Sequence, residues 1–244
     1  MPGFIAVLLR EMLILRRRFL RQLAGMSVSP LLYIIAFGYA MGGEARFDGH
    51  SYLEFLIPGL IAMSSMTQSF AIATDINVAR FYWHIFEEFQ AAPIRDLAYV
   101  AGETLAGMIR ALLSIGVVLL LSFLFGAPPH CGPLLWLAAL LNAFVFASLA
   151  VAMAMLVKSH ADQSLLTTFI ITPMAFLGGT FFPLDRLPEW AQRALSFLPL
   201  THASAAIRAA AFGETPAASH FIILALAGVL AFALALSVVK KARD

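Results

Sequence analysis

Residues 134–157 of this chain read LLWLAALLNAFVFASLAVAMAMLV, a continuous run without a charged side chain. A bilayer core of about 30 Å requires roughly 20 apolar residues in a helix. Five further blocks come close to that length, and short segments that hold nearly all the charge separate them: Leu23–Met41, Phe55–Ile76, Tyr99–Phe125, Gln163–Gly179 and His220–Val239. The pattern predicts an all-α integral membrane protein with six transmembrane helices.

Composition leads to the same class. The chain is 61% hydrophobic and 12% charged, with a mean hydropathy of +0.87, whereas about a quarter of the residues of a soluble domain are charged. Six spans and their connections use up the 244 residues. We therefore expect a single transmembrane domain over residues 1–244, without a separate soluble domain.

The distribution of basic residues predicts the topology, because cytoplasmic loops are enriched in Lys and Arg. With the N-terminus inside, most basic residues fall in the cytoplasm: Arg10, Arg16, Arg17, Arg18, Arg21, Arg80, Arg95, Lys158, Lys240, Lys241 and Arg243. Fewer fall outside: Arg46, Arg186, Arg193 and Arg208. Both termini are thus expected in the cytoplasm. The single cysteine, Cys131, falls outside and leaves no partner for a disulfide within the chain.

Two interpretations exist for residues 1–21. The run Arg16-Arg17-Arg18-Phe19-Leu20 before an apolar block resembles a twin-arginine export signal, which is cleaved off. Because that block has spanning length and others follow it, an uncleaved positive-inside anchor is favoured. At about 100° per residue, apolar residues gather opposite the arginines: Phe4, Leu8, Met12, Leu15 and Phe19 against Arg10, Arg17 and Arg21. We expect an amphipathic helix at the membrane surface.

The loop over residues 77–98 contains a second amphipathic segment. In Phe81–Gln90, one side is apolar and the other carries His84, Glu87, Glu88 and Gln90, before Pro93 ends the helix. The segment is too short and too polar to span a bilayer. Because helices that grip anionic lipid usually carry Lys and Arg, the acidic face favours a protein partner with a basic patch. An ordinary solvated face is the alternative.

Residues 180–219 form neither a simple loop nor a continuous apolar run. Gly178-Gly179 permits a break in the helix, and Pro183 and Pro188 interrupt the next residues. The apolar side chains of Trp190, Leu195, Phe197 and Leu198 suit the outer leaflet, with Arg186, Glu189 and Arg193 at the headgroups. We expect a re-entrant helical hairpin on the outer side, shielded by protein, with a surface loop as the alternative.

Several stretches, in their order and spacing, resemble the ABC-2 type transporter permeases along the whole chain. The matching stretches are Pro30-Leu31-Leu32-Tyr33 through Phe37-Gly38, Phe55-Leu56-Ile57-Pro58-Gly59-Leu60, Glu87-Glu88-Phe89-Gln90-Ala91-Ala92-Pro93, Leu177-Gly178-Gly179-Thr180-Phe181-Phe182-Pro183-Leu184, Leu187-Pro188-Glu189-Trp190, Pro199-Leu200-Thr201-His202 and Arg208. The resemblance implies six spans with both ends inside, a cytoplasmic coupling helix after span two and an outward re-entrant segment between spans five and six.

The resemblance also implies an exporter built from two permease copies and two ATPase subunits, with ATP and Mg on the ATPase. This chain contains no Gly-x-x-x-x-Gly-Lys-Ser/Thr loop, so we expect no ATP hydrolysis and no cofactor of its own. Its coupling helix would dock on the ATPase and pass on the closing of the nucleotide sites. The coupling residues are Phe81, Ile85, Phe86, Glu87, Glu88 and Phe89.

Charged residues within a span need partners. Glu103 and Arg110 lie on one face of the third block, about 10 Å apart along the axis, and a charge at mid-bilayer costs about 2.5–3.5 kcal/mol on insertion scales. Glu103 is expected near enough to the cytoplasmic end to reach water, whereas Arg110 needs a partner. A structural ion pair or packing contact is the leading interpretation, before a part in a conformational switch or a substrate contact.

Small hydroxyl residues in the second and fifth blocks commonly mark helix packing in lipid. The family resemblance supplies an alternative, because its spans one, two and five border the translocation path. Residues predicted to line such a path are Tyr33, Phe37, Ser64, Ser65, Gln68, Thr168, Thr172, Met174 and Phe176. The aromatic and soft apolar surface among them suits an amphipathic or hydrophobic cargo.

Other function classes fit less well. The six histidines show no i, i+4 metal spacing, and no Gly-x-Ser-x-Gly elbow is present, which disfavours a membrane hydrolase. An ion-gradient-driven transporter would place acidic residues at mid-span, yet Asp75, Glu103 and Asp162 fall near span ends. No metal site and no nucleic-acid partner are expected, only membrane lipid and the protein subunits.

The cargo is less constrained by the sequence. The stretch from Arg18 to Pro30 resembles the drug-export and Nod-factor-export branch of the family. A drug-like or lipid-like cargo is favoured, and a lipid-linked polysaccharide or glycolipid is the alternative. Low lysine with high alanine and arginine is typical of GC-rich bacteria, so the bacterial inner membrane is the expected location.

Overall fold

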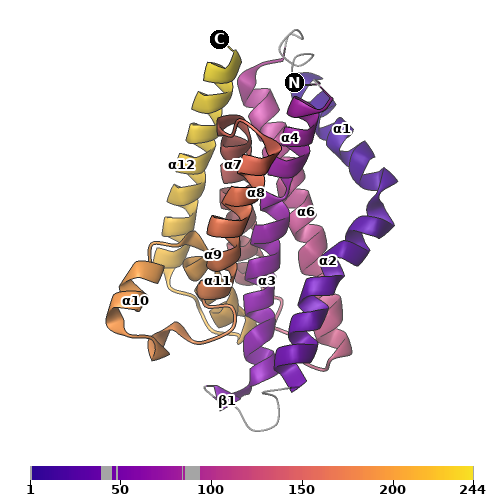
Figure 1. Cartoon of the computed structure of the whole chain (residues 1–244). Coiled ribbons are helices and arrows are strands. Elements are labelled where there is room, and N and C mark those ends of the chain that lie inside the picture. Colours follow the sequence, from indigo (N-terminus) through magenta and orange to yellow (C-terminus); the bar gives the residue numbers. More distant parts are fainter. Residues whose placement is uncertain (1, 40–45, 48, 84, 86–93, 244) are drawn as a thin grey trace.

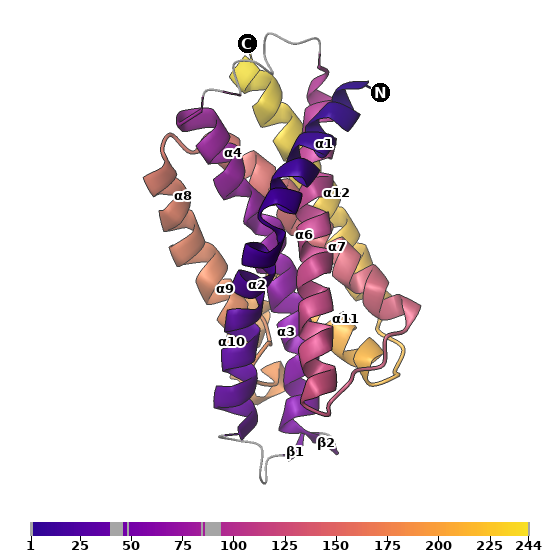
Figure 2. The same ribbon diagram turned by 90° about the vertical axis from the view of Figure 1, so that its right-hand side faces the viewer.

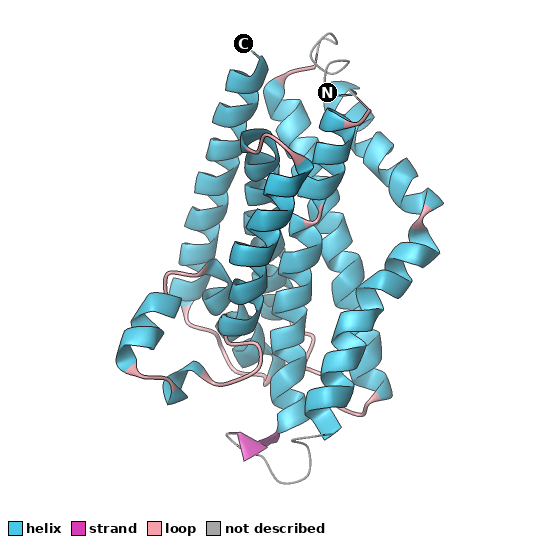
Figure 3. Ribbon diagram, viewed as in Figure 1, coloured by secondary structure: helices cyan, strands magenta, loops and turns pink. Residues whose placement is uncertain are grey.

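The computed structural model describes residues 2–39, 46, 47, 49–83, 85 and 94–243. Figure 3 shows that helices make up most of this part of the chain. In chain order the elements are α1 (Pro2–Arg17), α2 (Phe19–Tyr33), the π-helical turn η1 (Ile34–Tyr39), β1 (Arg46–Phe47), β2 (His50–Ser51), α3 (Tyr52–Phe70), α4 (Ile72–Phe81), α6 (Asp96–Leu124), α7 (Pro133–Leu156), α8 (His160–Leu166), η2 (Thr167–Ile171), α9 (Thr172–Leu177), η3 (Leu184–Arg186), α10 (Glu189–Leu195), α11 (Pro199–Ala211) and α12 (Ala218–Arg243).

Five helical stretches are long and apolar enough to cross a membrane, within the residues that the structure describes. They are Phe19–Gly38, Tyr52–Phe81, Asp96–Leu124, Pro133–Leu156 and Ala218–Ala242. The predicted block Gln163–Gly179 falls on α8, η2 and α9, which form one helical run from His160 to Leu177. Its polar first turn keeps it out of this set, so the sixth crossing stays a prediction.

The ends of the described chain lie together. In Figure 1, the start of α1 and the end of α12 are at one end of the bundle, and the hairpin of β1 and β2 is at the other. The view turned by 90° in Figure 2 shows the same arrangement. The predicted topology requires both ends on one side of the bundle, and the number of crossings and the side that faces the cytoplasm stay predictions.

The centre of the bundle is formed by α3, which packs against α6, α7 and α11. An 18-residue apolar stretch within Tyr52–Phe81, which spans α3 and α4, has 83% of its residues buried, whereas the corresponding stretches within Phe19–Gly38 and Ala218–Ala242 have 17% and 22% buried. The apolar exteriors of α2 and α12 therefore suit lipid or a protein partner, and α3 is sealed inside the domain.

Polar contacts between helices fix this packing. Asn142 of α7 donates from Nδ2 to the Ala62 carbonyl at 3.0 Å and to Ser65 Oγ at 2.6 Å. Arg80 of α4 donates to the carbonyls of Ala154 and Met155 at 3.0 Å each, which satisfies the last turn of α7 and places a cation at its negative end. Both contacts hold α7 against α3 and α4.

The segment after α9 divides into two parts. α11 enters the bundle, where residues such as Ala203 and Ile207 are fully buried, and it packs against α7, α3 and α12. α10 stands out from the bundle (Figure 1), with Trp190 74% exposed and Phe197 86% exposed in the connection after it. Of the predicted outer hairpin, the structure thus shows one arm packed in the bundle, and its insertion from the outer leaflet stays a prediction.

Candidate functional site

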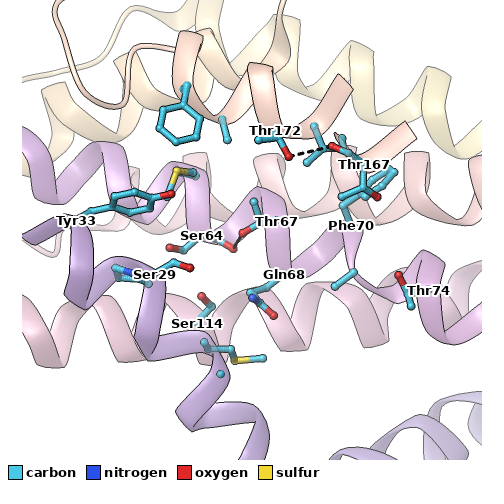
Figure 4. A pocket seen from close by; sticks show the side chains of 18 residues that line it. Ser29, Tyr33, Ser64, Thr67, Gln68, Phe70, Thr74, Ser114, Thr167 and Thr172 are labelled. Atoms are coloured by element: carbon cyan, nitrogen blue, oxygen red, sulfur yellow. Dashed lines mark hydrogen bonds between the residues drawn. The ribbon is translucent and has the colours of Figure 1, made fainter. Parts of the chain in front are cut away.

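A cavity of about 310 Å³ lies between α2, α3, α6 and the run from η2 to α9 (Figure 4). Its polar side chains are Ser29, Tyr33, Ser64, Thr67, Gln68, Thr74, Ser114, Thr167 and Thr172. Methionine and phenylalanine side chains complete the wall, from Met26, Met63, Phe70 and Phe176. A pocket with many hydroxyl groups but no charged side chain suits an uncharged, partly polar portion of a ligand. We call it the inner cavity.

The structure brings together residues from three of the predicted spans. Of the predicted path residues, the inner cavity is lined by Tyr33, Ser64, Gln68, Thr172 and Phe176.

The other four path residues lie elsewhere. Ser65 faces α7 and accepts from Asn142, Thr168 is exposed on η2 outside the cavity wall, and Met174 packs against the core. Phe37 lies in an aromatic cluster beside the inner cavity, with its ring centroid 5.1 Å from that of Phe181. Helical periodicity explains these differences, because adjacent helical residues point about 100° apart.

Four aromatic rings gather at the Tyr33 and Phe176 end of the cavity. Tyr33 contacts Phe181 edge-on with centroids 5.0 Å apart, and Phe176 stacks on Phe181 at 5.1 Å. Phe37 adds a ring 6.3 Å from Tyr33. Because these rings come from α2, η1, α9 and the turn after α9, a movement of α9 against α2 would open or close this end. We call the four residues the aromatic plug.

The turn that carries Phe181 is held by α3 and α11. Tyr52 donates its hydroxyl to the Phe181 carbonyl at 2.9 Å, Arg208 donates to the Gly179 carbonyl at 2.6 Å, and Ser204 donates to the Gly178 carbonyl at 2.5 Å. Gly179 has a φ of +82°, which a residue with a Cβ rarely adopts. The turn between α9 and η3 is thus fixed by three side chains and one glycine.

A second cavity of about 540 Å³ adjoins the first. Its charged side chains are Arg18, Arg21, Asp75 and Arg110. The two cavities share Gly25, Met26, Gln68, Ala71 and Thr74 in their walls. They therefore lie side by side along α2, and we call the second one the charged cavity.

Behind the charged cavity lies a buried ion-pair network, and Arg110 is at its centre. The guanidinium of Arg110 contacts the Asp75 carboxylate and lies 3.3 Å from Glu11. Arg10 lies 3.5 Å from both Glu11 and Glu103. Glu103 and Arg110 thus belong to one network but pair with different partners. Glu103 is 1% exposed, so the expectation that it reaches water is wrong: α1 covers it.

Glu11 is the network member that sequence reasoning missed. Its side chain is 1% exposed, and burial raises the pKa of its carboxyl against the opposite effect of Arg10 and Arg110. The sequence did contain a signal, because Glu11 is the only acidic residue among the first 21. Asn142 gave a similar signal, as a lone amide in the apolar run 134–157.

The predicted coupling residues are described only in part. Phe81 is the last residue of α4, half-buried, and its ring lies 5.1 Å from the Arg80 guanidinium carbon. Ile85 is described and half-buried. Phe86, Glu87, Glu88 and Phe89 lie outside the described residues. Their roles stay predictions, and the start of the predicted coupling helix belongs to α4.

In the described part of the chain, no group of three His, Cys, Asp or Glu side chains is placed to hold a metal ion. The contents of the site are instead a hydroxyl-lined cavity, an aromatic plug and an arginine-rich cavity. Such an arrangement offers polar, aromatic and positively charged surface side by side.

Known transport permeases are similar to this chain over most of its length. The chain is 30% identical over 236 residues to the inner membrane transport permease YadH of Escherichia coli K12, which covers 93% of this chain and 91% of that protein. It is 30% identical to nodulation protein J of Rhizobium meliloti, covering 87% and 82%. It is 26% identical to the daunorubicin resistance ABC transporter permease protein DrrB1 of Streptomyces coeruleorubidus, covering 77% and 67%.

The comparison with protein families gives a match of its own. Residues 3–212 match the family described as ABC-2 type transporter. This range includes α1, both cavities and the aromatic plug. With its apolar helices, the chain is a multi-pass inner membrane protein, and it belongs to the ABC-2 type transporter family.

Proposed function

We propose that this chain is the permease subunit of an ATP-driven exporter that moves a drug-like or lipid-like amphipathic molecule out across the inner membrane. The observation that carries the proposal is the inner cavity, where α2, α3 and α9 bring hydroxyl, amide and aromatic side chains together. These helices correspond to the first, second and fifth predicted blocks. The relative DrrB1 is named for daunorubicin resistance, which agrees with an organic, drug-like cargo.

The energy source in this proposal is a separate ABC ATPase, present in two copies and carrying ATP and Mg. Proteins of this family normally work with such a subunit, and the 244 residues contain no phosphate-binding loop. Closure of the nucleotide sites would push on the segment after α4. Because Arg80 joins α4 to α7 and Asp75 joins α4 to α6, the force would reach the cavity walls.

A second copy of the chain completes the proposed assembly. The outward faces of α2 and of the α8–α9 run bear exposed apolar side chains, including Leu32 at 57%, Phe169 at 72% and Ile170 at 47%. These two elements flank the inner cavity. In a homodimer that paired these faces, the inner cavities of the two copies would lie near each other.

The proposal is tested by purifying the tagged chain from its native membranes in mild detergent and assaying the bound material for ATP hydrolysis. We expect an ABC ATPase to copurify and to hydrolyse ATP, and we expect no hydrolysis after the permease is stripped of it. Reconstitution of the pair into vesicles should then give ATP-dependent transport of amphipathic dyes. Hydrolysis by the stripped permease alone would contradict the proposal.

A further inference from the structure

We propose that the inner and charged cavities together form a binding site for an anionic amphiphile, in which Arg18 and Arg21 hold the anionic group and the inner cavity holds the adjoining uncharged portion. The role of this site in transport rests on the proposed function. The inference adds the sign of the ligand's charge and names the side chains that bind the charged group. The shared walls of the two cavities allow one molecule to occupy both.

The net charge of the side chains that line the charged cavity favours an anionic ligand. Of the four charged side chains that line it, Asp75 and Arg110 contact each other, and Glu11 further offsets Arg110. Arg18 and Arg21 remain as excess positive charge, and no ion pair to either is found among the described residues. Arg18 immediately precedes α2 and Arg21 lies in its first turn, and both side chains line the charged cavity. Two guanidinium groups so placed suit a phosphate, sulfate or carboxylate.

Unpartnered buried groups give a second observation that points to a ligand. Ser114 is fully buried in the wall of the inner cavity, and its Oγ has no hydrogen-bond partner in the described structure. Arg110 is 4% exposed, and its Nε likewise lacks a partner there. A buried donor without a partner is costly. One belongs to a residue in each cavity wall, and because both atoms are covered in this structure, a ligand oxygen would satisfy them once the side chains turn toward the cavities.

The inner cavity accounts for the rest of the amphiphile. Figure 4 shows the side chains of Ser64, Thr67, Gln68 and Ser114 around the same space. Met26 and Phe176 supply apolar surface in the same wall. At the junction of the two cavities is Gly25, where an added Cβ would meet no atom within 4 Å. At the position that a Cβ of Gly25 would occupy, no side chain therefore fills the junction.

Binding is tested on the full chain in nanodiscs of phosphatidylcholine, without ATP or ATPase. The probe is dodecyl phosphate with a diazirine at the end of its alkyl chain. The comparison probe is dodecyl phosphocholine with the same diazirine-bearing alkyl chain. Photocross-linked peptides are mapped by mass spectrometry. The probe concentration that gives half of the maximal cross-linking is measured for peptides that contain residues 25–33 and 63–74. The variants are Arg18→Gln with Arg21→Gln, and as control Arg16→Gln with Arg17→Gln, which removes the same charge from exposed arginines outside both cavities.

We expect the parent to bind the phosphate about tenfold more tightly than the phosphocholine, as charge-assisted hydrogen bonds predict. The Arg18/Arg21 variant should lose this preference, and the Arg16/Arg17 control should keep it. No preference in the parent, or an equal loss in both variants, would overturn the inference, because the arginines would then act through the surface potential alone.

Competition separates the two sources of an anionic group. Displacement of the probe by unlabelled dodecyl phosphate, but not by inorganic phosphate, supports an amphiphile site. Equal displacement by inorganic phosphate would overturn the amphiphile part and assign a free-anion site. Since the assay needs no transport, its failure leaves the proposed export function standing, and a failed ATPase copurification leaves the binding result standing.

Discussion

Nη2 of Arg110 lies 3.3 Å from Oε2 of Glu11, a residue 99 positions earlier in the chain. The same guanidinium contacts Asp75, so one side chain of α6 joins α1 and α4. α4 leads toward the segment expected to meet the ATPase. A movement of α4 would therefore displace Arg110, and with it α1 and the wall of the charged cavity. The buried network thus links the coupling side of the domain to the proposed ligand site.

Removal of the Arg110 charge should destabilise the fold strongly. Arg110→Gln leaves Glu11 and Asp75 without their shared cation, and breaking a buried pair costs about 3–5 kcal/mol. The free energy of unfolding in mixed micelles measures the loss. Arg193→Gln is the matched control, because its pair with Glu189 is 81% and 84% exposed and exposed pairs contribute about 0–1 kcal/mol. Equal losses in the two variants would argue against a structural role for the network.

Obstruction of the cavity junction should block transport without unfolding the chain. Gly25→Phe adds a ring where a Cβ meets nothing within 4 Å, so the bundle need not shift while the passage fills. We expect ATP-dependent transport in vesicles to fall about tenfold or more, a change worth about 1.4 kcal/mol for each factor of ten. Gly116→Phe is the control, since that glycine also has open space and is exposed. Normal transport by Gly25→Phe would place the path elsewhere.

The contact of α3 with the turn at Thr180 leaves no room for a methyl group. A Cβ on Gly59 would clash with the backbone oxygen of Thr180, and backbone cannot yield as a side chain can. Gly59→Ala should destabilise the domain by about 1–3 kcal/mol, as overpacking does. Gly116→Ala should be neutral or slightly stabilising. Denaturation of both purified variants measures the difference, and a neutral Gly59→Ala would show that this contact is not tight.

The acidic residues after α4 are predicted to hold the ATPase. Reversing both charges, Glu87→Lys with Glu88→Lys, should preserve insertion but weaken ATPase association, because like charges facing each other across an interface cost several kcal/mol. A pull-down of the ATPase followed by a transport assay measures both effects. Phe86→Asp or Phe89→Asp should instead disturb the seating of the helix. If the double Lys variant binds the ATPase and transports as the parent does, Glu87 and Glu88 only face solvent and do not contact the ATPase.

Cys131 reports the topology of the chain. It is exposed in the connection between α6 and α7, and the positive-inside rule places it outside. Membrane-impermeant maleimide should label it from the periplasm in intact spheroplasts. Cys131→Ser is the background control, since the sequence has one cysteine. Labelling from the cytoplasmic face alone would invert the topology.

Local hydrophobicity was enough to predict most helices. The block Leu134–Val157 matches α7 within one residue at each end, and Tyr99–Phe125 lies almost wholly in α6. The information was local, because in lipid a long apolar run satisfies its backbone groups only as a helix. In Gln163–Gly179, where polar residues interrupt the run, a helix was expected and is found, but its π-helical turn was not predictable from hydropathy.

The composition of the site was also readable, but its arrangement was not. Hydroxyl runs in the second and fifth blocks marked the region, yet Ser64 lines the inner cavity while Ser65 bonds to Asn142. Which neighbour faces the cavity depends on the rotation of α3 about its axis. That rotation is set by its contacts with α6, α7 and α11.

The sequence by itself determined that this is a helical membrane protein, and its motif order indicated the family, because hydropathy and motif spacing are properties of short stretches. Only the tertiary structure decided that Arg110 pairs with Glu11 and Asp75 rather than with Glu103. It also placed the two cavities side by side along α2. Both outcomes depend on how helices far apart in the chain pack side by side, because an ion pair or a cavity wall requires atoms within a few ångströms whatever their separation in sequence.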